Sequence, residues 1–318
     1  MEAPEISPLS QDDAKRPLWS VMIPAYNPRP SHLEQALRSV LMQAPGPERM
    51  RIEVVDDCSP DVDVAALVKS IAGERVAFSR NAENLGLARG WNRCIERSNG
   101  IWVHILHQDD YVSPGFYQRL EEAANSHPEV SLIAARCFLV DEHGVINNVT
   151  DRLPGLESGG HEVNDYLYAN PFRCPGVVVR RAFYELYGGF RTDLTFTLDW
   201  EMWTRAITLS SGVALPEVLA SYRSFLENES TRLAEDADTL NDRMRLNAIF
   251  AERYPAFDRK KANRSVCLDA LSEARRFAQL GNQRIAWANL RYFQRNASIR
   301  LKLRQFIAQT VRKIARAL

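Results

Sequence analysis

Residues 101–126, "IWVHILHQDDYVSPGFYQRLEEAANS", form one complete strand–loop–helix unit. The apolar run at 101–106 is typical of a buried strand, and 113–126 has the apolar spacing of a helix, with Pro114 near its first turn. Between them stand two adjacent aspartates, Asp109 and Asp110. Like charges at the end of a core strand need a cation or several hydrogen-bond donors, so this loop predicts either a site for a hard divalent metal or an ordinary polar turn.

The same alternation of apolar runs and helical patterns continues through the first half of the chain. Strands are expected at 18–26, 51–57, 75–80, 101–106 and 130–140, and helices at 31–43, 63–73, 86–100 and 113–126. Such a series folds most economically as a parallel sheet with helices on both faces. Later elements are less regular: a hairpin after 140, a strand and a helix within 174–190, a helix at 198–209, a last strand at 212–223, and only helices from about 234.

The composition is that of a soluble globular protein, with 45% hydrophobic and 25% charged residues in 318. This length suits one large α/β domain, or a domain of about 220 residues with a small appendage. No apolar run approaches the roughly 18 residues of a membrane span. The acidic, polar residues 1–17 predict a disordered lead-in and not a secretory signal. Five scattered cysteines without a CxxC pair argue against disulfides or a zinc site and predict a cytoplasmic protein.

The net charge is zero, but the C-terminal end is basic: eleven Lys and Arg residues and no acidic residue follow Glu273. Residues 298–318 place apolar side chains at helical spacing with arginines away from that stripe. Three interpretations remain open for this tail: packing on the catalytic domain, adsorption to the anionic inner face of the plasma membrane, and nucleic-acid binding. The last is disfavoured, because no recognised binding motif accompanies the charge.

Polar clusters follow four of the expected strands. They are "PAYNP" (24–28), "VVDDCSPD" (54–61), "NAENLGLARGWN" (81–92) and "HQDD" (107–110). Singly, each predicts little, since Asp61, Asp63 and Asn84 are equally good helix caps. Ligands of parallel sheets bind at the carboxyl ends of the strands, where these loops meet. A rim that gathers so many carboxylates predicts a cation or a ligand that offsets their repulsion.

Other nucleotide-binding classes are disfavoured by what these loops lack. The first loop has no GxGxxG of a Rossmann dehydrogenase, and the chain has no GxxxxGK[ST] of a Walker-type kinase. A sugar nucleotidyltransferase would have a loop rich in glycine and arginine after the first strand, and "PAYNPRP" has no glycine.

Six motifs stand in an order and spacing that resemble one known family. They are "IPAYN", "VVDDCS", "NLGLARGWN", "LHQDD", "GGF" and "DWEMWTR". The chain resembles the inverting family-2 glycosyltransferases of the GT-A fold, within the nucleotide-diphospho-sugar transferase superfamily. The resemblance covers 18–232, and implies an α/β GT-A domain there, a mostly parallel sheet flanked by helices, with a helical C-terminal region at 233–318.

The resemblance also implies which residues hold the donor. Asn27 and Asp57 would face the nucleobase, where a carboxylate can accept the imide N–H of uracil or thymine; Asp56 would orient that loop, and Arg223 would steady the diphosphate. His107 stands where the family's metal motif has its first aspartate, and either donates to a ribose hydroxyl or packs at the strand end. The implied nucleotide contacts are Ala25, Tyr26, Asn27, Asp56, Asp57, Asn84, Arg89, His107, Gln108, Asp109 and Arg223.

The chemistry is implied to come from two further loops. Asp109 and Asp110 match the family's ligands for Mn²⁺ or Mg²⁺. Asp199 matches the catalytic base, with Glu201 as the fallback, although an aspartate there is also a plausible helix cap. The implied acceptor contacts are Trp200 and Gly189, and the alternative for Trp200 is a place in the core.

The expected function is therefore metal-dependent, inverting transfer of a sugar from a UDP- or dTDP-sugar to a hydroxyl of a glycan or lipid-linked acceptor. Surface polysaccharide or lipopolysaccharide assembly is the setting that the resemblance implies. The alternative is an inactive, nucleotide-sugar-binding relative that acts as an interaction module, which the carboxylates at both the metal and base positions disfavour. No nucleic-acid partner is expected.

Overall fold

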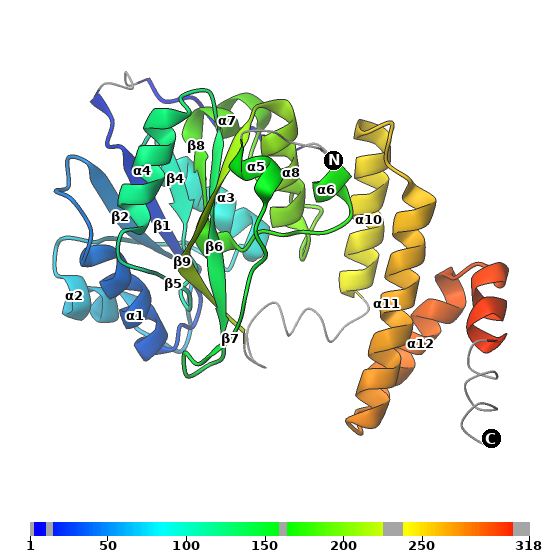
Figure 1. Ribbon diagram of the computed structural model, residues 1–318. Helices are drawn as coiled ribbons and strands as arrows, with labels where there is room; N and C mark the ends of the chain where they lie inside the picture. Colours follow the sequence, from blue (N-terminus) through cyan, green and yellow to red (C-terminus); the bar gives the residue numbers. More distant parts are fainter. Residues whose placement is uncertain (1–2, 11–14, 159–163, 225–237, 308–318) are drawn as a thin grey trace. The chain divides into compact units, whose positions relative to one another are not determined.

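The computed structural model describes residues 3–10, 15–158, 164–224 and 238–307 (Figure 1). They fall into two compact units, Met1–Phe225 and Leu226–Leu318. The boundary predicted between 232 and 233 lies outside the described residues. Within the described ranges, no helix combines the length and the apolar character that crossing a bilayer requires.

Nine described strands form one sheet in the first unit, in the order β3-β2-β1-β4-β8-β6-β9-β5, with β7 paired to β6. The first four are parallel, as predicted, and so are β6 and β9. Antiparallel pairs join β8 to β4 and β6, β7 to β6, and β5 to β9, so the sheet is mixed. The strands are β1 Trp19–Ala25, β2 Met50–Asp56, β3 Ala77–Arg80, β4 Trp102–Ile105, β5 Tyr111–Val112, β6 Leu132–Val140, β7 Ile146–Val149, β8 Val177–Arg180 and β9 Gly212–Arg223.

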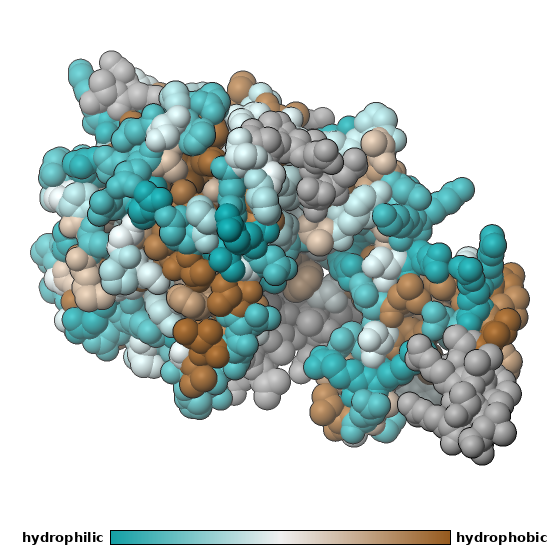
Figure 2. All heavy atoms as spheres, in the orientation of Figure 1, coloured by the Kyte–Doolittle hydropathy of each residue, from teal (hydrophilic) through white to brown (hydrophobic). Residues whose placement is uncertain are grey.

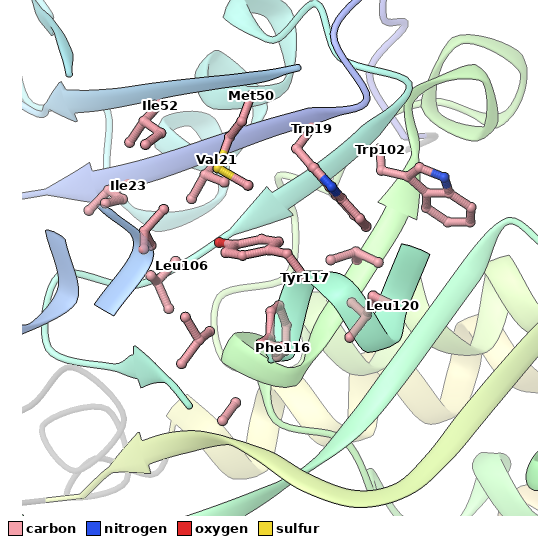
Figure 3. Close-up of a cluster of buried hydrophobic side chains, with 14 of the residues drawn as sticks. Trp19, Val21, Ile23, Met50, Ile52, Trp102, Leu106, Phe116, Tyr117 and Leu120 are labelled. Carbon is pink, nitrogen blue, oxygen red and sulfur yellow. The ribbon is translucent and has the colours of Figure 1, made fainter. Parts of the chain in front are cut away.

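Helices connect and cover these strands. They are α1 Pro30–Leu41, α2 Val64–Ala72, α3 Leu87–Arg97, α4 Phe116–Ser126, α5 Pro154–Glu157, α6 Asn164–Leu167, the short 3₁₀ helix η2 Cys174–Gly176, α7 Arg181–Tyr187 and α8 Leu198–Leu209. Alternate residues of β1, among them Val21 and Ile23, face α1, α2 and α4 in one large buried cluster. Figure 3 shows Phe116 and Tyr117 of α4 reaching the same cluster.

The two-residue strand β5 decides where the "HQDD" loop lies. The loop follows β4 directly, and β5 then pairs with β9, so that Tyr111 lies opposite Ser221. This pairing holds the loop against the end of β9, where Arg223 stands. The sequence does not predict β5, because two residues carry no periodicity of their own.

The prediction of a disordered lead-in is wrong for the part that is described, residues 3–10 and 15–17. Ile6 is buried, the carbonyl oxygen of Pro4 accepts a hydrogen bond from the amide of Gly189 (2.8 Å), and the buried Arg181 donates to the carbonyl oxygen of Ser7 (3.4 Å). A single apolar side chain and backbone hydrogen bonds thus fix a segment whose polar composition gave no sign of them.

The second unit contains only helices in its described part, as the sequence predicts from about 234. They are α10 Asp238–Arg253, α11 Arg259–Gln279, α12 Gln283–Asn296 and a further helix at 299–307. Their shared core includes Leu240, Val266, Phe293 and Leu301.

Candidate active site

The "HQDD" loop brings three potential metal ligands together at the end of β4. One ligand atom each of His107, Asp109 and Asp110 can be chosen so that all lie within 4.8 Å of one another. Burial and the neighbouring charge of Asp110 raise the pKa of Asp109 to about 7. The buried carboxylate of Asp110 accepts a hydrogen bond from the backbone of Arg223 through Oδ1 (2.8 Å), whereas its Oδ2 has no hydrogen-bond partner among the described residues and lies 3.4 Å from Nδ1 of His107. These oxygens suit a hard cation.

Arg223 holds this loop in place and is not available to the donor, which corrects its predicted contact with the diphosphate. The side chain is buried and donates to the carbonyl oxygens of Asp109 (2.9 Å), Asp141 (3.1 Å) and Glu142 (2.8 Å), and to Oε1 of Gln35 (2.5 Å). The guanidinium group therefore donates its hydrogen bonds to acceptors within the protein.

His107 is half-buried, with its ring centroid 4.8 Å from that of Trp91 on α3. Its Nε2 is buried and has no hydrogen-bond partner among the described residues. The packing interpretation thus describes its ring, while its Nδ1 lies 3.4 Å from Oδ2 of Asp110. The sequence analysis did not consider His107 as a metal ligand, although it stands where the family's motif has its first aspartate.

The aspartates after β2 accept most of their hydrogen bonds from protein donors. Asp56 is fully buried and accepts from Oγ of Ser59 (2.5 Å) and Nη1 of Arg80 (2.8 Å). These contacts support its predicted orienting role, and its place among the nucleotide contacts stays a prediction. Asp57 accepts from Nδ2 of Asn81 (2.8 Å) and the amides of Leu85 (2.9 Å) and Gly86 (3.0 Å), so it fastens the loop before α3.

The loop after β1 is fixed in the same way. The buried Ala25 accepts at its carbonyl from the amide of Asp57 (2.7 Å), and Asn27 exchanges hydrogen bonds with Asp61. Gln108 accepts from the amide of Tyr26 (2.8 Å) and donates to its carbonyl (3.2 Å), which ties the loop after β1 to the "HQDD" loop. The Tyr26 side chain remains exposed.

Two predicted nucleotide contacts, Asn84 and Arg89, lie at the start of α3 and differ in their hydrogen bonding. Asn84 accepts from the amide of Gly86 (2.9 Å), which is the N-cap residue of α3, so its side chain shapes the turn before the helix, and α3 has no side-chain cap hydrogen bond among the described residues. Arg89 is exposed on the first turn of α3 and makes no hydrogen bond or ion pair with the described residues. Of this pair, only Arg89 has a side chain that is free for an anionic ligand.

Asp199 lies in the first turn of α8, one residue after Leu198, and does not cap the helix, since the N-cap residue is Thr197. Its carboxylate accepts from the amide of Trp200 (2.6 Å) and from Nδ2 of Asn170 (3.2 Å). Burial raises the pKa of Asp199, against the opposing influence of that amide and the positive charge of Arg173. A partly buried carboxylate with a raised pKa is suited to accepting a proton.

Glu201, the predicted fallback base, forms an ion pair with a buried arginine. It is buried and paired with Arg205 (3.0 Å), which also donates to the carbonyl oxygens of Tyr187 (2.5 Å), Gly188 (3.1 Å) and Gly189 (2.7 Å). Glu201 therefore neutralises a buried arginine that closes the C-terminal end of α7.

The two predicted acceptor contacts are also structural. Trp200 is buried and its indole N–H donates to the carbonyl of Tyr166 (2.6 Å), so the core alternative is the correct one. Gly189 is buried, and its amide and carbonyl are both hydrogen-bonded. A Cβ at Gly189 would lie 2.3 Å from Oδ1 of Asn92, which explains the need for glycine there.

The segment 170–174, "NPFRC", contributes residues that the sequence analysis missed. Asn170 bonds Asp199, and the charge of Arg173 acts on it. Burial raises the pKa of the Cys174 thiol, His107 opposes this shift, and the charges of Asp199 and Asp110 add to it, so Cys174 interacts electrostatically with residues of both loops. The only signal in the sequence was a polar Asn and Arg beside a proline in an irregular region.

A comparison with known proteins identifies the family. The family model Glycosyl transferase family 2 matches residues 20–174. An uncharacterized protein of Mycobacterium tuberculosis is 31% identical over 245 residues, which is 73% of this chain and 75% of the relative. The chain belongs to glycosyltransferase family 2. It is 28% identical over 215 residues to the amylovoran biosynthesis glycosyltransferase AmsE of Erwinia amylovora, covering 65% of this chain and 76% of AmsE.

Solved structures agree on the fold. S. aureus TarS in complex with UDP-GlcNAc has a TM-score of 0.59 at 16% identity, covering 89% of this glycosyltransferase and 82% of that chain. The mannosyltransferase PcManGT from Pyrobaculum calidifontis, in complex with GDP-Man and Mn²⁺, has a TM-score of 0.57 at 17% identity, covering 98% and 82%. The predicted GT-A fold and the predicted transferase class are confirmed.

Proposed function

We propose that this glycosyltransferase is metal-dependent and inverting, and moves a sugar from a UDP- or dTDP-sugar to a hydroxyl of a glycan or lipid-linked acceptor in surface polysaccharide assembly. One observation carries the proposal: the "HQDD" loop gathers potential metal ligands of His107, Asp109 and Asp110, with Oδ2 of Asp110 lacking a hydrogen-bond partner among the described residues, while Asp199 has a carboxylate with a raised pKa.

The metal site is argued from the donor set. Asp109, Asp110 and His107 would hold Mn²⁺ or Mg²⁺, because one ligand atom of each lies within 4.8 Å of the others and Oδ2 of Asp110 has no hydrogen-bond partner among the described residues. The ion would stabilise the negative charge of the departing nucleoside diphosphate. The Mn²⁺ in the complex of PcManGT supports this proposal.

Asp199 is the proposed base. Asn170 and the first turn of α8 orient its carboxylate, while burial keeps its proton affinity high. It would take the proton of the acceptor hydroxyl as the oxygen attacks the anomeric carbon, opposite the bond to the leaving diphosphate. Such in-line displacement inverts the anomeric configuration.

The preference for a pyrimidine base rests on the number of hydrogen bonds that the Asp57 carboxylate can still accept. Oδ1 already accepts two hydrogen bonds and Oδ2 accepts one, which leaves about one acceptor position on the carboxylate. The imide of uracil or thymine donates one N–H and would fill it. Guanine presents two donors on the corresponding edge, of which one would stay unpaired at a cost of about 1–3 kcal/mol.

The acceptor class rests on the relatives. AmsE is named for the biosynthesis of amylovoran, and other matching proteins are named for teichoic acid and succinoglycan biosynthesis. These names support a glycan or lipid-linked glycan as the acceptor.

The test is a thermal-shift panel of UDP, dTDP and GDP, each with and without Mn²⁺, followed by an assay for hydrolysis of the matching sugar nucleotides. Native-state binding raises the unfolding temperature, so UDP or dTDP with Mn²⁺ should give the largest shift. A larger shift with GDP would overturn the choice of base. The same shift with and without Mn²⁺ would overturn the metal.

A further inference from the structure

The helix at 299–307 in the second unit exposes an apolar face. Ile299, Leu303 and Ile307 follow one another at intervals of four residues and are 77%, 56% and 58% exposed. That spacing places them on one side of the helix. Figure 2 shows apolar spheres over this last described helix.

The same helix has a second, buried side. Leu301 is 5% exposed and belongs to the core that α10, α11 and α12 share. At about 100° per residue, Leu301 points roughly opposite to Ile299 and Leu303. Packing in the second unit therefore uses one side of the helix and presents the other outward.

Positive charges border the exposed face. Arg300 and Arg304 stand along one edge of it and Lys302 along the other, and none of the three forms an ion pair with another described residue. The surrounding chain has no acidic residue after Glu273 but eleven basic ones. An apolar stripe with cationic side chains on both edges matches a surface that is itself apolar beneath an anionic layer.

We propose that this face binds an anionic lipid bilayer, with Ile299, Leu303 and Ile307 entering the interface and Arg300, Lys302 and Arg304 meeting the lipid phosphates. A second copy of the chain is a poorer occupant, because the same positive edges would meet across the contact. Nucleic acid would use the charges and leave the apolar side chains in water.

The proposal is tested by co-sedimentation of the full chain with two kinds of vesicle: one part phosphatidylglycerol to three parts phosphatidylcholine, and phosphatidylcholine alone. The parent should pellet with the anionic vesicles and remain in solution with the neutral ones. The bound fraction should fall as NaCl rises, because surface charge is screened within about 8–10 Å at physiological ionic strength.

Two double variants separate the apolar and the charged parts. Leu303→Gln with Ile307→Gln should weaken partitioning at least about tenfold, since two apolar side chains no longer enter the interface. Arg300→Gln with Arg304→Gln should weaken it about 30-fold, from about 1 kcal/mol for each basic residue near the surface. The matched controls are Leu186→Gln, a leucine on α7 that is even more exposed than Leu303, and Lys69→Gln on α2, both of which should bind as the parent does.

Several results would overturn the proposal. One is equal binding to both kinds of vesicle, and another is equal binding by the parent and the apolar variant. A third is a loss of vesicle binding in the control variants that is as large as the loss in the double variants. Sedimentation velocity without lipid tests whether a second copy of the chain binds this face instead. If the parent is a dimer and the apolar variant is a monomer, the face is assigned to a second copy. Circular dichroism that matches the parent shows that a variant which no longer binds is still folded.

Discussion

The aspartates after β2 and those after β4 occupy equivalent places, at the ends of the two strands that flank β1, but their surroundings differ. Asp57 accepts three hydrogen bonds, and the buried Asp56 is paired with Arg80. After β4, Asp110 keeps an oxygen without a hydrogen-bond partner among the described residues, and Asp109 has a pKa raised to about 7.

This difference shows how to separate scaffold from chemistry in a site crowded with carboxylates. A carboxylate that protein donors already satisfy positions a loop, and removing it costs stability. A carboxylate left short of donors or cations is held ready for something that binds later. A related contrast recurs on α8, where Glu201 forms an ion pair with Arg205, whereas Asp199 accepts two hydrogen bonds but has no ion pair with the described residues.

The largest effect is expected at Glu201, on stability. Glu201→Gln removes the charge that neutralises the buried Arg205, and breaking a buried pair in this way costs about 3–5 kcal/mol. Urea unfolding followed by tryptophan fluorescence measures the loss. The matched control is Glu96→Gln, in an exposed pair with Arg93, which should cost less than about 1 kcal/mol. Equal losses of unfolding free energy in Glu201→Gln and Glu96→Gln would contradict the structural role given to Glu201.

The next effect is on turnover. Asp199→Asn should lower turnover at least about 10²-fold, the lower range for a positioned base, while nucleoside-diphosphate and Mn²⁺ binding stay within about twofold of the parent. Steady-state kinetics measures the turnover, and calorimetry on the same preparation measures the binding of the nucleoside diphosphate and Mn²⁺. If Asp199→Asn stays active and Glu201→Gln is the inactive variant, the roles of scaffold and base are reversed.

The smallest effect is expected at Asn84. Asn84→Ala removes an acceptor for the amide of Gly86 at the start of α3, which should cost about 1 kcal/mol of stability and leave donor affinity within about twofold. Arg89→Gln on the same turn is the partner variant, because its free charge should matter to donor affinity and not to stability. A larger loss of affinity from Asn84→Ala than from Arg89→Gln would return Asn84 to the donor site.

Much of the fold was predictable because it depends on local periodicity. The β–α alternation up to α4 follows from apolar spacing alone, and so does the helical character of the second unit. The antiparallel β8 and the short β5 were not predictable in their pairing, because partners far apart in the sequence decide it. The lead-in was misjudged for the same reason, since Ser7 and Leu9 form hydrogen bonds with residues 174 and 176 positions later.

The site was predictable in its carboxylates and not in its contacts. Motif order located Asp109, Asp110 and Asp199, but residue type alone could not show that Arg223 spends its donors on neighbouring loops. Likewise, only the packing of α8 against the end of α7 shows that Glu201 serves Arg205. An arginine or a glutamate in a motif is ambiguous until its partners are known.

The central claim is that the carboxylates after β4 are short of partners because a divalent cation binds there together with the donor. Isothermal titration calorimetry of UDP, with and without Mn²⁺, on the parent and on Asp109→Asn tests it most directly. The parent should bind UDP at least about tenfold more tightly with Mn²⁺, a gain of about 1.4 kcal/mol. Asp109→Asn should bind equally with and without the metal, and the same strengthening in both proteins would contradict the account.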